Sequence, residues 1–209
     1  MRYTELMNHT PQIKRAIQFA ARKHHGHFRA ESEPLPYITH LFSVALLVAE
    51  DPATLKLRRA SGADDDYDEV VIAALLHDTL EDTDTTREEL VAAFGERVAG
   101  LVEHVSEKKD VDRKRLGWKE RKMAYLKHLE EAPGDALLIA IADKIDNIES
   151  KLEALEKEGP ALFERWKRPQ ADYLWYHGEA ARIALERLPS HPLTKRLLEA
   201  HAREVAVIS

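Results

Sequence analysis

The sequence has no cysteine and little glycine or proline, and these scarcities narrow the structures that it can form. Without cysteine, disulfides and thiolate metal sites are excluded, which fits a reducing compartment. Only 8 glycines and 9 prolines interrupt 209 residues rich in Ala, Leu, Glu, Lys and Arg, so the composition favours helix. No apolar run approaches membrane-spanning length, and the start lacks the apolar stretch of a secretory signal. We therefore expect a cytoplasmic protein with no membrane partner.

The sequence also has no excess of positive charge. The formal net charge is −6, which argues against a general role in coating nucleic acid. Apolar residues make up 44% of the chain and charged residues 33%, so a packed core is expected rather than disorder. The length suits one domain, which we place at residues 1–209.

Apolar residues recur at helical spacing along the chain, and turn signals separate the segments. Helices are expected to start at Thr10-Pro11 and near Tyr37, to cover 70–78, and to run from a cap at Thr85 or Thr86 to Phe94-Gly95. Further helices are expected at 96–107, 125–132 and 135–150. The remainder is broken near Gly159-Pro160, Pro169, Pro189 and Pro192 and is expected to form three more helices. A loop at 26–37 and a polar connector at 51–69 lie between them. No alternating strand pattern is present, so the predicted fold is an all-α bundle.

Two of the most apolar predicted helices carry charged residues toward the interior. His77 and Asp78 follow four apolar residues, Asp143 lies within IAIADKIDN, and the spacing of His40 points it at the core. A buried carboxylate is costly unless it is paired or binds a metal. Two imidazoles and two carboxylates on three helices suit Mn²⁺, Fe²⁺ or Zn²⁺. The alternative is a satisfied core histidine, with carboxylates that act as caps or ion-pair partners.

Two further acids follow the His-Asp pair. On a continuing helix, Glu81 lies four residues after His77 and Asp82 four after Asp78, so each sits one turn beyond a candidate ligand. Acids at a helix C-terminus oppose the helix dipole, and a nearby metal would compensate them. Glu81 and Asp82 are therefore candidates to orient a water, take its proton or protonate a leaving oxygen. The alternative is that they end the helix in solvent.

Residues 107–122, EKKDVDRKRLGWKERK, form a basic run inside this acidic chain. The run suits polyphosphate oxygens, although a solvated charged helix explains most of its members equally well. Aromatic residues in and after this run could stack a base, but core packing is the favoured role for each of them. They are Trp118, Trp166, Tyr173, Trp175 and Tyr176.

Five blocks of the sequence resemble the HD superfamily of metal-dependent phosphohydrolases, whose signature doublet is matched by His77-Asp78. The finer similarity is to the hydrolase domain of RelA/SpoT-type alarmone enzymes, especially to stand-alone small alarmone hydrolases of the Mesh type. The blocks are FAARKHHGHFR, PYITH, VIAALLHDTLEDTDTTREEL, FGERVAGLVEHVSEKK and IADKIDN. They place the core match at about 10–150, and we expect 151–209 to add helices that complete an HD-domain bundle.

The resemblance implies a Mn²⁺-dependent enzyme that removes the 3′-diphosphate of (p)ppGpp, giving GDP or GTP and pyrophosphate. It implies degradation without synthesis. The residues that it implicates fall into three groups. They are His40, His77, Asp78 and Asp143 for the metal, Glu81 and Asp82 for the attacking water, and Arg29, Lys109 and Asn147 for the nucleotide.

The chain departs from the family pattern near the expected nucleotide site. Ala30 stands where the family usually has lysine, Leu41 where it has proline, and His27 where it has glutamine. Other substrates therefore stay open: an adenine alarmone, NADPH or a deoxynucleotide. A nucleotide-binding regulator with a structural metal is a further alternative, although binding alone would not need both Glu81 and Asp82. The sequence leaves a homodimer open.

Overall fold

The computed structural model describes residues 10–29, 35–50, 65–108, 110–111, 114–165 and 168–208. These residues form an all-α bundle with one very short β-hairpin, as the composition and periodicity predicted in outline. The elements are α1 (Pro11–Lys23), α2 (Ile38–Glu50), α4 (Asp65–Leu76), α5 (Thr79–Asp82), α6 (Arg87–Phe94), α7 (Glu96–Val105), β1 (Asp110–Val111), β2 (Lys114–Arg115), α8 (Trp118–Glu131), α9 (Gly134–Glu158), the 3-10 helix η1 (Gly159–Arg165), α10 (Gln170–Arg187) and α11 (Pro192–Ile208).

Two predicted helix starts are confirmed by their caps. The Thr10 hydroxyl accepts a hydrogen bond from the Ile13 amide at 3.3 Å, and Pro11 occupies the first turn of α1. Of the two candidate caps for α6, Thr86 is the one used, and it accepts from the Glu89 amide at 3.2 Å. Gly95 ends α6 with φ of 89°, a conformation that glycine adopts without steric cost.

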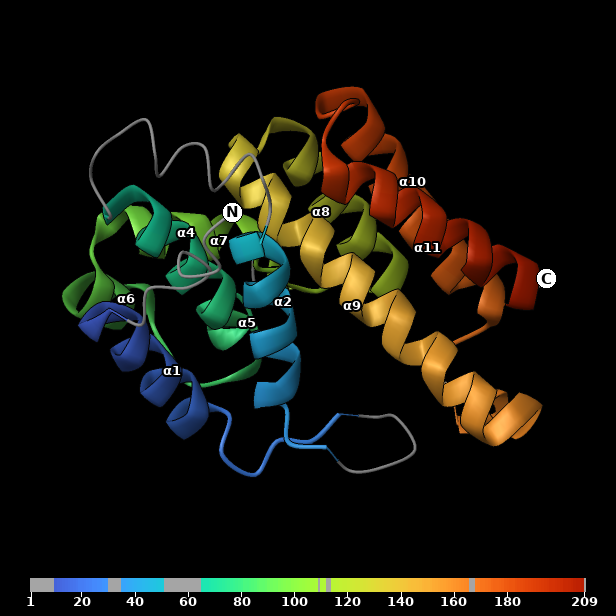
Figure 1. Cartoon of the computed structure of the whole chain (residues 1–209), viewed down its shortest axis with the longest axis horizontal. Helices are drawn as coiled ribbons and strands as arrows, with labels where there is room; N and C mark the ends of the chain where they lie inside the picture. The colour runs from blue at the N-terminus through green and yellow to red at the C-terminus, as the bar shows by residue number, and fades with distance from the viewer. Residues whose placement is uncertain are drawn as a thin grey trace, which may run out of the picture.

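The two strongly apolar helices lie at the centre of the molecule, as predicted. Every residue from Val70 to Leu76 in α4 and from Ala136 to Asp146 in α9 is buried. Helix α4 packs against α1, α2, α7 and α9, and α9 also packs against α10 and α11. In Figure 1 α9 runs diagonally across the molecule, with α1, α2 and α4–α7 on one side and α10 and α11 on the other.

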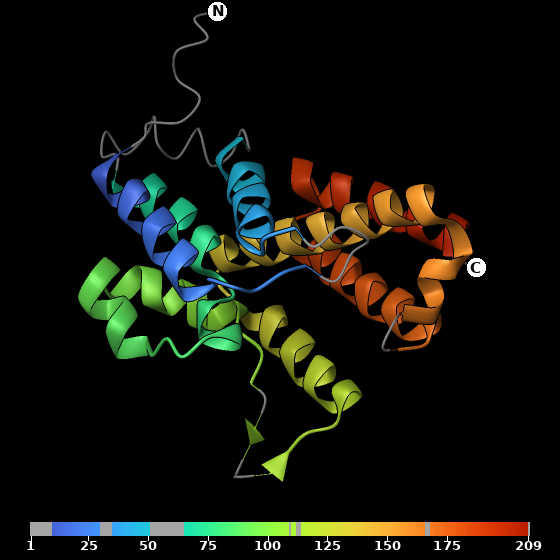
Figure 2. The same ribbon diagram turned by 90° about the horizontal axis from the view of Figure 1, so that it is seen from below.

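Two expectations about connecting segments need correction. The connector predicted at 51–69 is helical from Asp65 onward, because its acidic residues suit the first turn of a helix; residues 51–64 lie outside the described part of the chain. The basic run contains an antiparallel pair of strands that pairs Asp110 with Arg115, and two residues per strand are too few to show alternation. This hairpin extends below the helices in Figure 2. Among the described residues, no helix combines the length and the apolarity that crossing a membrane requires.

A buried hydrogen bond between a histidine and a glutamate joins the last two helices. Nδ1 of His177 in α10 lies 2.8 Å from Oε1 of Glu204 in α11, and the Glu204 side chain is 0% exposed. His201 adds a second contact, with its Nδ1 3.1 Å from Oε2 of Glu204. Burial lowers the pKa of His177 to about 4. Burial alone would raise the pKa of Glu204, but the hydrogen bonds from both histidines lower it to about 2, so an anionic carboxylate faces two imidazoles at neutral pH.

Replacing Glu204 by leucine is expected to lower the free energy of unfolding by about 2 kcal/mol, because it leaves the buried imidazole of His177 without an acceptor. Urea denaturation followed by circular dichroism measures the change. Glu199→Leu on the exposed side of α11 is the matched control, with an expected change within about 0.5 kcal/mol. Equal midpoints for the two variants would contradict a stabilising role for the pair.

Candidate metal centre and active site

The four predicted metal ligands come together in the middle of the bundle. His40 comes from α2, His77 and Asp78 from the junction of α4 and α5, and Asp143 from α9. Nε2 of His40 lies 3.5 Å from Oδ2 of Asp78 and 3.2 Å from Oδ1 of Asp143. Nε2 of His77 lies 3.0 Å and 3.8 Å from the same two oxygens. Side chains far apart in sequence therefore surround one point.

Both imidazoles are fixed through their other ring nitrogen. Nδ1 of His77 lies 2.9 Å from the carbonyl oxygen of Ala74, to which it can only donate, so the lone pair of this ring is on Nε2. Nδ1 of His40 lies 2.6 Å from Oδ2 of Asp146, a carboxylate that favours a proton on that nitrogen. Metal-binding histidines are held in this manner, with the second nitrogen bonded to a carboxylate or a backbone carbonyl.

The ligand set fits a divalent cation. His40, His77 and Asp78 offer ligand atoms that all lie within 4.8 Å of one another. Nε2 of His77 is fully buried and has no hydrogen-bond partner among the described residues, which is costly for a polar atom unless a ligand satisfies it. Two imidazole nitrogens and two carboxylates form a nitrogen and oxygen set suited to a first-row divalent ion.

The local charges favour a cation at this point. Burial alone would lower the pKa of His40, but hydrogen bonds with Asp143, Asp146 and Asp78 raise it well above its ordinary value. Burial would likewise raise the pKa of Asp78, whereas the two histidines hold it well below its usual range. The carboxylates that attract a proton onto an imidazole would attract a metal ion to the same place.

The sequence predicted one helix that continues through His77 and Asp78, and this prediction is wrong. Helix α4 ends at Leu76, the two residues form a turn, and α5 is a separate single turn. Asp78 has φ of −94° and ψ of 0°, and its carbonyl oxygen accepts from the amide of Asp82 at 2.9 Å. The break lets the adjacent side chains of His77 and Asp78 both face the same centre, whereas neighbours on a regular helix point about 100° apart.

Glu81 and Asp82 both line a cavity of about 150 Å³ that also includes Asp78 and Asp143. Oε2 of Glu81 accepts a hydrogen bond from the backbone amide of Glu107 at 3.1 Å. Burial, together with the negative charge of Asp78, raises the pKa of Glu81 to about 7. Asp82 is exposed, and the two acids therefore occupy different environments at the same cavity.

The cavity also contains residues that the sequence did not single out. Lys144 contacts Oδ2 of Asp143, and Lys122 lies on another wall. The hydroxyl of Tyr37 donates to Oδ2 of Asp78 at 2.7 Å. Predicted Asn147 is present too, and its amide donates to Oδ1 of Asp143 at 2.5 Å. Lys144 follows Asp143 directly, so a lysine beside a buried aspartate was the signal that could have identified it.

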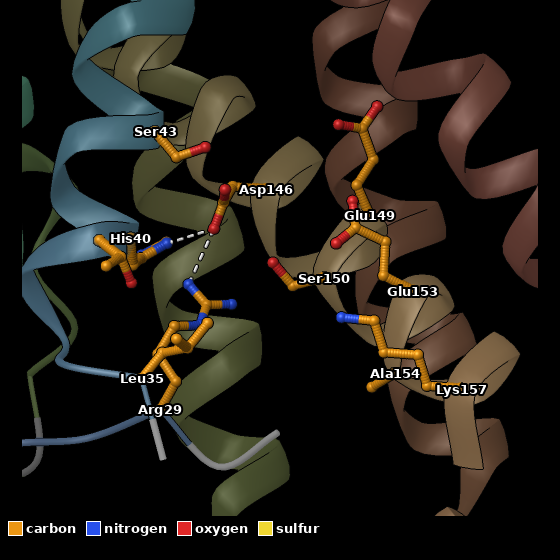
Figure 3. Close-up of a pocket in the computed structure, with 11 residues that line it drawn as sticks. Arg29, Leu35, His40, Ser43, Asp146, Glu149, Ser150, Glu153, Ala154 and Lys157 are labelled. Carbon is orange, nitrogen blue, oxygen red and sulfur yellow. Dashed lines mark hydrogen bonds and ion pairs between the residues drawn. The ribbon is translucent and has the colours of Figure 1, made fainter. Parts of the chain in front are cut away.

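Arg29 lies on the other side of His40, in an ion pair. Its Nη1 is 2.8 Å from Oδ2 of Asp146, the same oxygen that contacts His40, as the dashed lines in Figure 3 show. These residues border a second cavity of about 280 Å³ that follows α9 toward Lys157. The sequence missed Asp146, although it lies one turn after Asp143 on an apolar helix. Predicted Lys109 lies outside the described residues.

The basic run is partly neutralised by its own first residue. Glu107 is buried and binds Arg121 at 2.5 Å, and its other oxygen accepts from Lys122. Among the aromatic residues, the Trp118 ring packs against those of Tyr173, Trp175 and Tyr176 at centroid distances of 6.2–6.5 Å. These contacts agree with the packing role that was favoured. Trp166 lies outside the described residues.

The all-helical fold and its central His-Asp cluster define a helical domain built around a group of side chains that could hold a divalent cation. A family model described as "HD domain" matches residues 16–165. The chain belongs to the HD-domain family.

Named relatives make the comparison more specific. The chain is 35% identical over 139 residues to the guanosine-3′,5′-bis(diphosphate) 3′-pyrophosphohydrolase MESH1 of Danio rerio, covering 66% of this chain and 68% of that protein. It is 40% identical over 152 residues to a protein of Aquifex aeolicus that carries the same enzyme name without MESH1. That match covers 70% of this chain but only 19% of the Aquifex protein.

Two solved structures superpose on this chain. A metazoan ortholog of SpoT described as hydrolysing ppGpp superposes with a TM-score of 0.69 at 26% identity, covering 94% of this chain and 97% of that chain. The protein lmo0812 of Listeria monocytogenes superposes with a TM-score of 0.62 at 29% identity, covering 78% and 97%.

Asp78→Asn is expected to weaken binding of a divalent cation by more than about 100-fold, because it removes a charged ligand. Calorimetric titration of the apo protein with MnCl₂ measures this affinity. Asp84→Asn is the matched control, since Asp84 is 88% exposed and lies in the same segment outside the cluster. Equal affinity in the two variants would show that the cluster is not the metal site.

Proposed function

We propose that this protein is a Mn²⁺-dependent hydrolase that removes the 3′-diphosphate of guanosine alarmones and releases pyrophosphate. The observation that carries the proposal is the meeting of His40, His77, Asp78 and Asp143 at one point, beside a cavity that also holds Glu81. The names of the relatives, guanosine-3′,5′-bis(diphosphate) 3′-pyrophosphohydrolase, support the substrate.

The four ligand residues would hold the cation through two imidazole nitrogens and two carboxylates. Mn²⁺ is the ion we propose, with Fe²⁺ and Zn²⁺ as alternatives for the same ligands. When bound, such an ion supplies Lewis-acid activation of water and neutralises charge on phosphate oxygens. Asp146 and the carbonyl oxygen of Ala74 keep His40 and His77 turned toward it.

Glu81 is the residue we assign to proton transfer. The water oxygen forms a bond to the phosphorus attached to the ribose 3′ oxygen, and the bond between that phosphorus and the 3′ oxygen breaks. Glu81 takes the water's proton and returns a proton to the departing 3′ oxygen. A carboxyl group whose pKa is about 7 can exist in either state near neutral pH, which suits it to accept and return a proton. Asp82, on the same single turn, would orient the water.

Positive charge for the phosphate groups is available in the same cavity. Lys122 and Lys144 both line it, and Lys144 is fixed by Asp143. Asn147 lies beside the same carboxylate, close to the expected ribose and phosphates. Arg29 would pack against the base from the neighbouring cavity, with its guanidinium oriented by Asp146. Lys109 in the basic run is a further candidate for contact with phosphate.

Glu81→Gln is expected to lower turnover by about 10²–10⁴-fold while metal and nucleotide binding persist, because the amide keeps the shape but cannot accept the proton. Pyrophosphate release from ppGpp measures turnover, and calorimetry with ppGpp measures binding. Glu88→Gln, exposed at the start of α6, is the control and should leave both unchanged. A variant that keeps full turnover would contradict the assigned role, and wild-type binding without turnover would identify a regulator instead.

A substrate panel tests the base and the phosphate position. The Mn²⁺-loaded protein is incubated separately with ppGpp, ppApp, NADPH and dGTP, and the products are identified by chromatography. The expected result is pyrophosphate and GDP from ppGpp, with slower or no reaction of the other three. Inorganic phosphate from NADPH, with both alarmones intact, would overturn the proposed substrate while leaving the metal centre in place.

A further inference from the structure

Two histidines outside the metal centre meet at the surface where α7 and α8 pack against each other. Nδ1 of His104 in α7 lies 3.1 Å from Nε2 of His128 in α8. The ring centroids are 5.0 Å apart, and the ring planes differ by 16°. His128 is exposed and His104 is half-buried, so water and ions reach the pair.

The geometry of the pair suits a metal ion. A hydrogen bond between two imidazoles needs a proton on one nitrogen and a lone pair on the other, so two ring nitrogens already face each other. With metal–nitrogen bonds of about 2.0–2.1 Å, two nitrogens 3.1 Å apart subtend roughly 95° at the ion. That angle is close to the one between neighbouring ligands in octahedral and square-planar sites. Turning each ring by roughly 40° from a head-on arrangement would point both nitrogens at one position.

The surroundings of His128 favour the neutral form that binds metals. Burial and the neighbouring His104 lower the pKa of His128, and Lys108 acts in the same direction. Glu131 and Glu103 act in the opposite direction, and their negative charges would favour a cation nearby. A neutral imidazole is the form that offers a lone pair.

We propose that His104 and His128 form a second metal site, which binds an imidazole-preferring divalent ion such as Ni²⁺, Cu²⁺ or Zn²⁺ and bridges α7 and α8. Two imidazoles with water in the other positions bind these later ions more strongly than Mn²⁺, following the general order of affinities. The site is therefore separate from the central cluster in place. The ion takes the position of the shared proton, which moves to the other nitrogen of the ring that carried it.

The site has a structural connection to the central cavity. The segment between α7 and α8 carries Glu107, whose backbone amide contacts Glu81 and whose side chain binds Arg121 and Lys122. An ion that joins His104 to His128 would hold α7 against α8, the helix that carries Lys122. Occupancy of the surface site would therefore restrain the wall of the cavity that carries Lys122.

Calorimetric titration with NiCl₂ tests the site in protein already saturated with Mn²⁺ at its centre. Wild type is expected to show one Ni²⁺-binding event per chain that is weakened in His104→Ala and in His128→Ala. Each variant should lose about tenfold or more in affinity for that ion, because one imidazole no longer benefits from the second at high effective concentration. The double variant should bind Ni²⁺ no more tightly than either single variant.

His25→Ala is the matched control, since His25 is another exposed histidine and should bind Ni²⁺ as wild type does. Unfolding temperatures with and without NiCl₂ provide a second readout, because an ion that binds only the folded state raises them. Addition of NiCl₂ should raise the unfolding temperature of wild type more than that of either variant. Equal Ni²⁺ binding by wild type and the variants, or loss in only one of the two single variants, would overturn the proposal.

Discussion

The structure depends on compensating the charge of carboxylates buried at the centre of a helical bundle. Asp143 is 8% exposed, and Asp78 adds a second carboxylate close by. Ionised groups in such a place are stable only when cations or strong hydrogen-bond donors face them. His40 and His77 provide part of that compensation, and a divalent cation between the same atoms would provide the rest. The helices that surround this point are arranged so that all four side chains reach it.

The groups around the metal ligands are themselves paired with other polar side chains farther from the centre. Asp146 holds His40 on one side and Arg29 on the other, so a positive guanidinium balances the carboxylate that orients the imidazole. On the opposite side Tyr37 donates to Asp78 and stacks on His24 at a centroid distance of 5.1 Å. These contacts tie the loop before α2 to the two central helices. A substitution in this loop would therefore change the positions of the metal-ligand side chains without replacing any of them.

Local chemistry explains how much of this arrangement could be predicted from sequence. The apolar runs before His77 and around Asp143 identified the two central helices, because a charge amid such residues has few stable explanations. His40 followed from its place on an apolar stripe, and the HD signature identified the family. The partner of Arg29 could not be found in this way, since Asp146 lies 117 residues away and only the packing of α9 against the loop joins them. The break at His77-Asp78 was missed because periodicity does not record a turn inside a continuous apolar pattern.

The two oxygens of Asp143 divide the site into its two functions. Oδ1 faces the imidazoles and Asn147, and Oδ2 faces Lys144. One carboxylate thus borders both the proposed metal position and the cationic wall proposed for the phosphates. The two therefore lie on either side of a single carboxyl group. Removing it would leave Lys144 buried beside Tyr125 and Tyr176 without its anion, as well as depriving the metal of a ligand. In the proposed mechanism the same residue therefore couples the metal position to the orientation of the substrate's phosphates, which is the coupling that an in-line attack on phosphorus requires.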